Sequence, residues 1–351
     1  MSRPGEARPP RRPAPRDRTR LPLEFPPFPL PRRGSRAAIV KRDTTETLRD
    51  EHAAAPVALP ASGSVVAGRY ELARELGRGG YGVVFEAFDR ELGRTLALKA
   101  MRADRGSAVA ERRFRREVLL MRAVLHPNLV RLFDFGSEAD FVFLTMELVR
   151  GESLAARLAR TGPLAVDETV TLAAALVQGL GALHEAGIVH RDVKPSNVLI
   201  PEGEPGGLAR VRLSDLGVAR RLDSEEAHPP TGPAMVGTLG YLAPEVVRGA
   251  RARPASDLFS LGLTLADALL GRDRREHDDA LAAALTHLRP VPWARELARL
   301  RPETPPWLAE WIERLLQPAP EQRYPSAREA SRDLESRRTP RPQLGRWLRR
   351  R

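Results

Sequence analysis

The hydrophobic pattern of the chain changes once, near residue 150, and this change limits the folds that the chain can adopt. Between residues 70 and 148, short runs of β-branched and aromatic residues alternate with glycine-containing turns, which predicts about five strands. Residues 107–125 repeat apolar side chains at helical spacing instead. Beyond Gly151 we expect helices at 153–160, 167–187, 255–271, 278–288, 305–317 and 326–337, and short strands at 188–190, 197–200 and 211–217. This order predicts an α+β protein, β-rich with one key helix in its first part and helical in its larger second part.

Both ends of the chain differ in composition from the middle. Residues 1–66 are rich in Pro, Arg and Ala without sustained periodicity, which predicts a disordered tail, and residues 338–351 form a second basic tail. The folded domain is therefore expected at 67–337, divided into 67–149 and 150–337. The net charge of +12 comes from the two ends, while the middle is mildly acidic. We do not expect nucleic-acid binding on charge alone, but a regulatory partner could act through the tails.

The chain contains no cysteine, which excludes disulfides and thiolate metal sites and suits a reducing compartment. The basic N-terminus is followed by proline and glutamate rather than by the apolar run of a secretory signal. The two most apolar stretches are interrupted by polar residues or too short to cross a bilayer. We therefore expect a cytoplasmic protein without a membrane span, and the end of the chain at Arg351 strengthens this expectation.

The stretch "LGRGGYGVV", residues 76–84, spaces three glycines as G-x-G-x-x-G. Glycines let a backbone approach phosphates closely, but the same spacing occurs in dinucleotide-binding turns and by chance. A dinucleotide turn should lead into a helix, whereas this stretch continues into a second predicted strand. The glycines are therefore expected at the tip of a hairpin that covers a nucleotide, with binding residues Leu76, Gly77, Arg78, Gly79, Gly80, Tyr81, Gly82, Val83 and Val84.

A single lysine, Lys99, interrupts the apolar run "TLALKAM". The chain has 57 Lys and Arg, and only Lys41, Lys99 and Lys194 are lysines. An isolated lysine in a strand often extends its ammonium to solvent from a sheet edge, and that alternative stays open here. The helical pattern of 107–125 turns one acid, Glu117, toward its apolar side, so Glu117 is a candidate partner of Lys99.

The stretch "IVHRDVKPSNVLI" places four charged or polar residues between two apolar runs, which packing does not explain. Asp192 is suited to accept the proton of an attacking hydroxyl, Lys194 to neutralise a transferring phosphoryl group, and Asn197 to hold a metal ion. A solvated turn is the competing interpretation. Asp215, at the end of a predicted strand, is suited to bind Mg²⁺ that bridges phosphate oxygens.

Further along the chain, "GTLGYLAPEVV" and "ASDLFSLG" contain Thr238, Glu245 and Asp257. Singly, these residues could form a turn, a cap and a helix N-terminus. Arg323 is a candidate ion-pair partner of Glu245, and Asp257 could hold the backbone of the HRD loop (residues 190–197).

In their order, these motifs resemble the eukaryotic-like (Hanks-type) serine/threonine protein kinases of bacteria, over about residues 68–337. The resemblance implies a two-lobed protein kinase fold with ATP and Mg²⁺ between the lobes. It also implies Met146 as gatekeeper, a linker from Glu147 to Val149 whose backbone meets adenine, and a purine pocket lined by Val84, Ala97 and Leu199. "DLG" stands where the family commonly has D-F-G.

By this resemblance, Lys194 and Thr238 indicate protein Ser or Thr hydroxyls as substrates. Arg191 indicates activation by phosphorylation, for which Ser224 and Thr231 are candidates. The implied function is transfer of the γ-phosphoryl group of MgATP to proteins in bacterial signal transduction, with autophosphorylation. A pseudokinase that binds nucleotide as a scaffold is the alternative.

Overall fold

The computed structural model describes residues 59–79, 82–102, 116, 118–138, 141–215, 239–271 and 291–338. All of them lie in one compact unit, Ala54–Arg351. Of the predicted site residues, this leaves Gly80, Tyr81, Glu117, Ser224, Thr231 and Thr238 outside the described residues. The helix expected at 278–288 also lies outside them.

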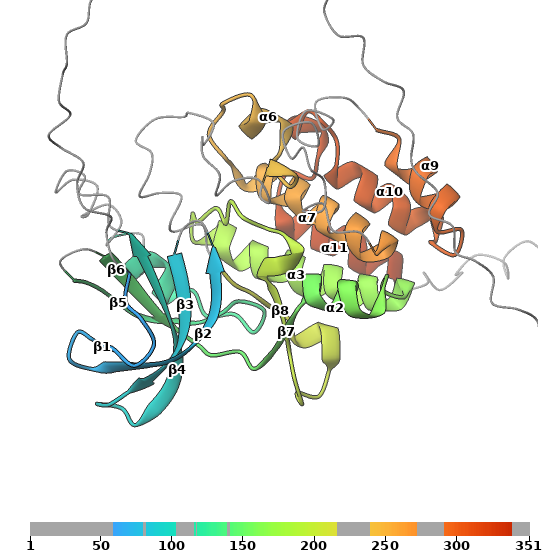
Figure 1. Cartoon of the computed structure of the whole chain (residues 1–351). Coiled ribbons are helices and arrows are strands. Elements are labelled where there is room, and N and C mark those ends of the chain that lie inside the picture. Colours follow the sequence, from blue (N-terminus) through green and yellow to red (C-terminus); the bar gives the residue numbers. More distant parts are fainter. Residues whose placement is uncertain are drawn as a thin grey trace, which may run out of the picture. The chain divides into compact units, whose positions relative to one another are not determined.

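The first lobe is built on one antiparallel sheet, shown with its strands in Figure 1. Its six strands follow the order β1-β2-β3-β4-β6-β5, with bounds β1 (Val65–Val66), β2 (Tyr70–Gly79), β3 (Gly82–Asp89), β4 (Arg94–Arg102), β5 (Leu132–Ser137) and β6 (Phe141–Met146). Strands that follow each other in sequence pair with each other, except β4, whose second neighbour is β6 rather than β5. This order makes β4 an interior strand, paired with β3 on one side and β6 on the other.

The two faces of this sheet belong to different hydrophobic cores. Successive residues of a strand point to opposite faces of the sheet, so neighbours in sequence belong to different cores. Val83 and Leu98 pack in a core made by the first lobe alone, whereas Ala97 and Met101 pack in a core shared with the helical lobe. The helical residues 118–123 add Val118 and Met121 to the shared core. The shared core fixes the sheet against the second lobe.

A small second sheet opens the other lobe. It contains β7 (Gly151–Ser153), β8 (Val198–Pro201) and β9 (Arg212–Leu213), in that order. The segment before β5 is joined to β9 by backbone hydrogen bonds, from Val130 N to Leu213 O at 3.1 Å and from Leu213 N to Asn128 O at 2.9 Å. The two lobes are thus connected by main-chain bonds as well as by the linker after β6.

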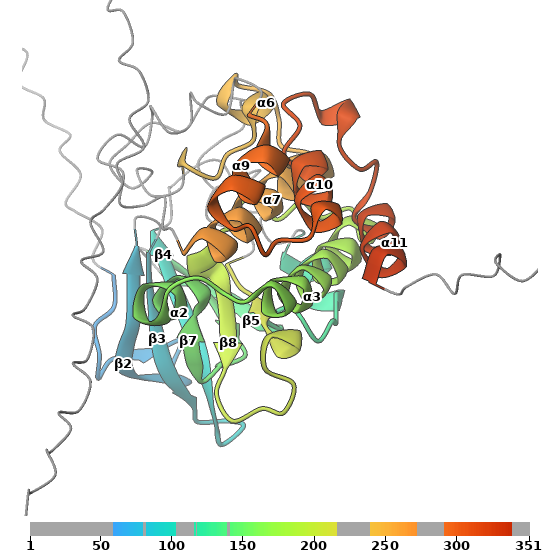
Figure 2. The ribbon, with the colours of Figure 1, turned by 90° about the vertical axis from the view of Figure 1, so that its right-hand side faces the viewer.

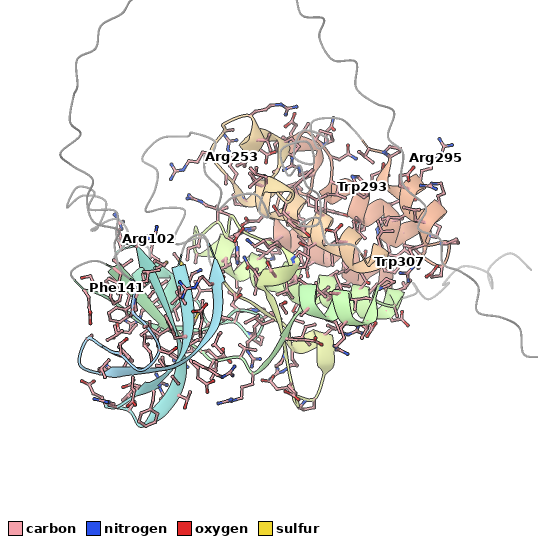
Figure 3. All side chains as sticks on the ribbon, in the orientation of Figure 1. Arg102, Phe141, Arg253, Trp293, Arg295 and Trp307 are labelled. Atoms are coloured by element: carbon pink, nitrogen blue, oxygen red, sulfur yellow. The ribbon has the colours of Figure 1, made fainter. Side chains whose placement is uncertain are left out.

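Helices form the rest of this lobe: α2 (Leu154–Thr161), α3 (Val166–Glu185), α6 (Pro244–Val247), α7 (Pro254–Leu270), α9 (Trp293–Leu300), α10 (Pro306–Leu315) and α11 (Ala327–Arg338), with 3₁₀ turns η1 (Pro195–Asn197), η2 (Gly207–Arg210) and η5 (Pro320–Gln322). The central helix α3 packs against α7 and α11, and α10 packs against α7 and α9. Figure 2 shows α11 beside α3, with α7, α9 and α10 above them. Figure 3 labels Arg102 and Phe141, which pair at one end of the sheet, and Trp293 and Trp307 on the helical lobe.

The helix α3 begins and ends where its sequence favours it. The carboxylate of Glu168 accepts a hydrogen bond from the backbone N–H of Ala165 at 2.9 Å, and Gly187 takes the positive φ of +74° that follows the last turn. Among the described residues, α3 is the one helix long and apolar enough to cross a membrane. Over half of its most apolar window is buried against its neighbours, as in the core helix of a globular domain.

The fold confirms the predicted two-lobed α+β architecture, but several elements differ from those expected. The sheet starts before residue 67, because Val65–Val66 pairs with β2 and Val66 is buried. Residues 188–190, expected as a strand, have no strand structure, and β9 is limited to two residues. The helix α9 was not expected from the sequence, since charged residues interrupt its apolar positions.

Candidate active site

The described residues of the glycine-rich stretch belong to the β2–β3 hairpin and lie at its end, as predicted. Pairing continues to Gly79 opposite Gly82. Gly82 has a φ of +148°, and a Cβ there would collide with the carbonyl oxygen of Ala100, so the site requires glycine. A Cβ on Gly77 or Gly79 would meet no atom within 4 Å. The backbone at these two glycines is therefore open to a ligand.

The remaining residues of the stretch differ in their surroundings. Val84 packs against the core shared by the lobes. The side chain of Val83 lies in the separate core of the first lobe and is fully buried, so only its backbone can face a ligand at the predicted site. Arg78 pairs with Glu75, with one N–O distance of 2.6 Å, and Leu76 is exposed.

Lys99 lies on the interior strand β4, opposite Val84 of β3 and Leu144 of β6. This position excludes the sheet-edge interpretation of the lysine. Its side chain is 15% exposed, and Nζ lies 2.5 Å from Oδ1 of Asp215. The cation thus joins the first lobe to the end of β9. Glu117, its predicted partner, is outside the described residues.

The HRD loop holds its three predicted residues in one hydrogen-bonded group. Nδ2 of Asn197 donates to Oδ2 of Asp192 at 2.8 Å and to the carbonyl oxygen of Asp192 at 2.7 Å. Nζ of Lys194 lies 2.8 Å from Oδ2 of Asp192. The side chains of Asp192 and Lys194 are 12% and 15% exposed. The Asp192 carboxylate is therefore oriented by two donors, which argues against a solvated turn. It remains partly accessible, as a substrate hydroxyl would require.

A buried carboxylate holds this loop from behind. Asp257, at the start of α7, accepts hydrogen bonds from the backbone N–H groups of His190 at 2.7 Å and Arg191 at 2.8 Å. It also lies 2.9 Å from Nε2 of His184 on α3. Because a carboxylate only accepts, this nitrogen carries the hydrogen. The structure confirms that Asp257 holds the backbone of the HRD loop.

His190 connects the loop to the strand that leads to Asp215. Its Nδ1 accepts from the backbone N–H of Asp192 at 3.2 Å, so the ring hydrogen is on Nε2, which donates to the carbonyl oxygen of Ser214 at 3.1 Å. Burial holds the pKa of His190 below its usual value. The ring is thus a neutral spacer of fixed orientation.

Asn197 and Asp215 lie at the same end of the β8–β9 pair. The backbone N–H and the hydroxyl of Ser214 donate to the carbonyl oxygen of Asn197 at 2.8 and 3.0 Å. Asp215 has a φ of +60° and Arg191 of +70°, a backbone region that non-glycine residues rarely adopt. Such conformations concentrate at functional sites. Among the described residues, no three His, Asp or Glu side chains form a metal cluster.

The predicted purine pocket is bordered by apolar residues from both lobes. Ala97 and Met146 are Cα partners on β4 and β6, and both belong to the shared core, against which Val84 and Leu199 pack. Beside them is a cavity of about 20 Å³, lined by Lys99, Met101, Val130, Leu132, Leu144, Met146, Ser214 and Asp215. A space of this size holds about one water molecule. Sequence reasoning did not assign Leu144 or Ser214 to the site. Leu144 is the Cα partner of Lys99 across the sheet, and Ser214 precedes Asp215 in the chain.

The linker after β6 is held by contacts of Glu147 with β9 and with the residue before β5. The carboxylate of Glu147 lies 3.0 Å from Nε of Arg212, and its backbone N–H donates to the carbonyl oxygen of Arg131 at 2.9 Å. Val149 is partly buried against the shared core. The side chain of Glu147 is therefore directed to β9.

The ion pair between Glu245 and Arg323, expected from the sequence, is present in the helical lobe. Arg323 binds Glu245 through two N–O contacts of 2.9 and 2.8 Å, and its guanidinium also donates to the carbonyl oxygens of Ala255, Gln317 and Pro318. All five N–H groups are used, and the arginine side chain is fully buried. Burial alone would raise the pKa of Glu245, but the hydrogen bonds from Arg323 and Ser256 hold it below its usual value.

Comparisons with known proteins identify the family of this chain. The family model described as "Protein kinase domain" matches residues 70–333. The chain is 37% identical over 295 residues to the serine/threonine-protein kinase PknA of Mycobacterium tuberculosis, covering 81% of this chain and 65% of that protein. It is 32% identical over 276 residues to the serine/threonine-protein kinase PrkC of Bacillus subtilis, covering 78% and 41%. The chain thus spans less than two thirds of the length of these relatives.

Two solved structures have a similar fold. The crystal structure of the kinase domain of Mycobacterium tuberculosis PknI superposes with a TM-score of 0.60 at 26% identity, covering 80% of this chain and 99% of that chain. The crystal structure of Rad53 residues 1–466 in complex with AMP-PNP gives a TM-score of 0.59 at 25% identity, covering 75% and 64%.

Proposed function

Because the chain belongs to the protein kinase domain family, we propose that it is a serine/threonine protein kinase that transfers the γ-phosphoryl group of ATP to hydroxyl groups of proteins, including its own. One observation carries this proposal. Lys99 and Asp215 are paired across the lobes. The side chain of Asn197 donates to Asp192, and its carbonyl oxygen accepts from Ser214, the residue before Asp215. The charged groups that phosphoryl transfer requires are thereby held in one hydrogen-bonded assembly.

In the proposed reaction, the hydroxyl oxygen of a Ser or Thr side chain forms a bond to the γ-phosphorus as the bond from that phosphorus to the β-phosphate oxygen breaks. Asp192 takes the hydroxyl proton, and ADP leaves. The contact of Lys194 with the same carboxylate supports a role in neutralising charge on the transferring group. For Lys99 we propose binding to the α- and β-phosphates, for which its ammonium must exchange part of its contact with Asp215.

Asn197 and Asp215 fit a divalent cation, and we propose Mg²⁺. They supply one amide oxygen and one carboxylate at the same end of the β8–β9 pair. Mg²⁺ takes one or two protein carboxylates and completes its shell with phosphate oxygens and water, so one carboxylate and one amide oxygen suit it. The ion would neutralise charge on the phosphate oxygens of bound ATP.

For the nucleotide base we propose the apolar surface of Val84, Ala97, Met146 and Leu199. The backbone from Glu147 to Val149 is proposed to recognise the adenine edge. The side chain and N–H group of Glu147 are already engaged by Arg212 and Arg131. Its carbonyl oxygen and the N–H of Val149 are therefore the groups that we propose for adenine. The open backbone at Gly77 and Gly79 is proposed to cover the phosphates.

Labelled ATP tests the function directly. The protein is incubated with γ-labelled ATP, Mg²⁺ and a generic acceptor protein, beside the variants Asp192→Asn and Lys99→Met and the control Arg299→Met, an exposed arginine on α9. We expect label on Ser or Thr in the wild type and in the control, and none in the other two. Absence of label from every form, with nucleotide still bound, would favour the pseudokinase scaffold instead.

We further propose that the enzyme acts in the cytoplasm, where ATP is available, and the absence of cysteine supports this location. Phosphorylation at Ser224 or Thr231, and a regulatory partner acting through the basic tails, are the proposed inputs. Mapping of phosphorylation sites in fully active protein checks the first, and unmodified Ser224 and Thr231 would exclude it. Cell fractionation checks the location.

A further inference from the structure

A second cavity, of about 350 Å³, lies on the side of the linker that Arg212 occupies. We call it the rear pocket. It is lined by the loop 124–129 that follows the helical residues 118–123, by Arg131 before β5 and the linker residue Glu147 after β6, and by Arg210 of η2 and Arg212 of β9. Cavities that bind small molecules commonly measure roughly 300–1,000 Å³. The rear pocket is therefore large enough for a ligand.

The walls of the rear pocket are held in place by hydrogen bonds. Asn128 donates through Nδ2 to the carbonyl oxygens of Ala209 and Val211, both at 2.9 Å. On the opposite wall, Arg212 joins Glu147 at 3.0 Å and Glu204 at 3.0 Å. Both lobes thus contribute to the pocket, and a ligand does not have to assemble it.

The charge of the lining favours an anion. Three guanidinium groups line the pocket against one carboxylate, that of Glu147. Arg212 is paired with Glu147 and Glu204, and Arg210 lies 3.6 Å from Glu204. The guanidinium of Arg131 has no ion pair within the described part of the chain, and its side chain is exposed. It makes only a distant contact with the ring of Phe133, whose centroid is 5.9 Å away.

The remaining wall is mostly apolar. Val124, Leu125, Pro127 and Leu129 line it together with one polar residue, His126, whose Nδ1 accepts a hydrogen bond from the backbone N–H of Asn128 at 3.1 Å. Leu125 is 64% exposed, more than any other large apolar side chain in the described residues. A hydrocarbon chain placed there would remove this leucine from water. The pocket therefore combines one available cation with one uncovered apolar surface.

We propose that the rear pocket binds a small free organic anion in which a single carboxylate is attached to a short aliphatic chain. The carboxylate pairs with the guanidinium of Arg131, and the chain packs on Leu125 and Leu129. This site is separate from the proposed nucleotide site and does not depend on the proposed function.

The test uses the full-length protein, the fluorescent anion 8-anilinonaphthalene-1-sulfonate as reporter and octanoate as competitor. We expect saturable fluorescence that octanoate displaces and octanamide, its uncharged counterpart, displaces at least about tenfold less well, because a charge-assisted hydrogen bond is lost. Octanoate should also raise the thermal unfolding midpoint, since a ligand that binds the native state stabilises it.

Three variants locate the site. Arg131→Ala should weaken displacement by octanoate about tenfold or more, and Leu125→Asp should abolish it. Arg299→Ala, an exposed arginine on α9, should behave as wild type. All three side chains are exposed, so their unfolding midpoints without ligand should be close to wild type. Equal displacement by octanoate and octanamide, no displacement by either, or wild-type behaviour of Arg131→Ala and Leu125→Asp would each overturn the proposal.

Discussion

Two ion pairs, Lys99 with Asp215 and Arg323 with Glu245, join distant parts of this chain in opposite ways. The ammonium of Lys99 makes one short contact with Asp215, whose side chain is 32% exposed. Arg323 is fully buried and uses all five of its N–H groups, two of them on Glu245. The first pair can exchange its partner for a ligand, while the second has no hydrogen-bonding capacity left.

The difference separates function from stability. A partly exposed pair contributes roughly 0–1 kcal/mol to folding. Removal of one member of a buried pair costs about 3–5 kcal/mol, because the other charge remains buried without a partner. The two pairs should therefore respond oppositely to the same kind of substitution, one losing activity and the other losing stability.

Lys99→Met should break the first pair with the largest effect on activity. We expect phosphoryl transfer to fall about 10³-fold or more, because the charge that binds the phosphates is removed. The free energy of unfolding in urea should change by less than about 1 kcal/mol. Lys99→Arg should also lose activity, since a planar guanidinium does not replace a compact ammonium. Comparable activity of Lys99→Arg and wild type would contradict this explanation.

Arg323→Ala should break the second pair and lower the free energy of unfolding by about 3–5 kcal/mol, measured by urea denaturation. Three carbonyl oxygens and the Glu245 carboxylate lose their donors together. Per folded molecule, activity at low temperature should stay near wild type. The control is Arg299→Ala, which removes an exposed arginine paired at i,i+3 and should cost less than about 1 kcal/mol. A loss for Arg323→Ala that does not exceed this control would remove the distinction between the pairs.

Asp257→Asn tests a case between the two pairs. This carboxylate is buried, and hydrogen bonds engage both of its oxygens as in Glu245, but it holds the HRD loop, so its loss should affect both stability and activity. An amide would turn an N–H group toward a donor, either Nε2 of His184 or a backbone N–H. We expect kcat to fall about 10- to 100-fold and stability to fall by about 1–3 kcal/mol. Asp167→Asn, at an exposed position of α3, serves as the matched control. Loss of stability with unchanged kcat would show that the loop keeps its geometry without Asp257.

A pH titration of Asp89 gives the smallest expected effect. Asp89 pairs with Arg69, and this third ion pair is intermediate in burial between the other two. Hydrogen bonds from Arg69 lower the pKa of Asp89 to about 2, against the opposing effect of burial, and the backbone N–H groups of Leu92 and Glu91 assist. The ordinary value is about 3.9. Since the folded-state pKa is depressed, this stabilisation is present above about pH 4 and is lost as the pH falls through about 2.

Between these two pH values, wild type should lose about 1 kcal/mol more unfolding free energy than Asp89→Asn, because solvent around the partly exposed Arg69 weakens the pair. Urea denaturation at several pH values measures the difference. Identical pH dependence in the two proteins would show that the pair contributes nothing in this range.

Local signals account for most of what the sequence predicted. The strand β3 continues the glycine-rich stretch, as predicted, because it begins at Gly82 and a turn follows Asp89. The strand β1 was missed because two residues carry no period. Residues 188–190 resembled a strand, but the backbone N–H of His190 donates to the carboxylate of Asp257 and not to a neighbouring strand. Such bonds join residues about 70 positions apart and leave no local pattern.

For the site, the residue types were predictable, and so were two contacts, Glu245 with Arg323 and Asp257 with the HRD loop. The partner that the structure gives to Lys99 was not. Lys99 was singled out by its rarity, but its contact with Asp215 spans 116 residues. His184 lies in an apolar helix, and nothing in the sequence connects it with Asp257. Val83 was assigned to the binding residues because it continues the glycine motif. Strand alternation, which was visible, places its side chain on the other face from Val84.

The backbone bonds between the segment before β5 and β9 bear on how the chain could be divided. Asn128 and Val130 precede the linker in sequence, yet they bind Ala209, Val211 and Leu213 beyond it. A cut within the linker would leave each fragment with unpaired main-chain groups and half of a shared core. We therefore expect neither fragment to fold alone, and a split version should regain structure only when both halves are mixed.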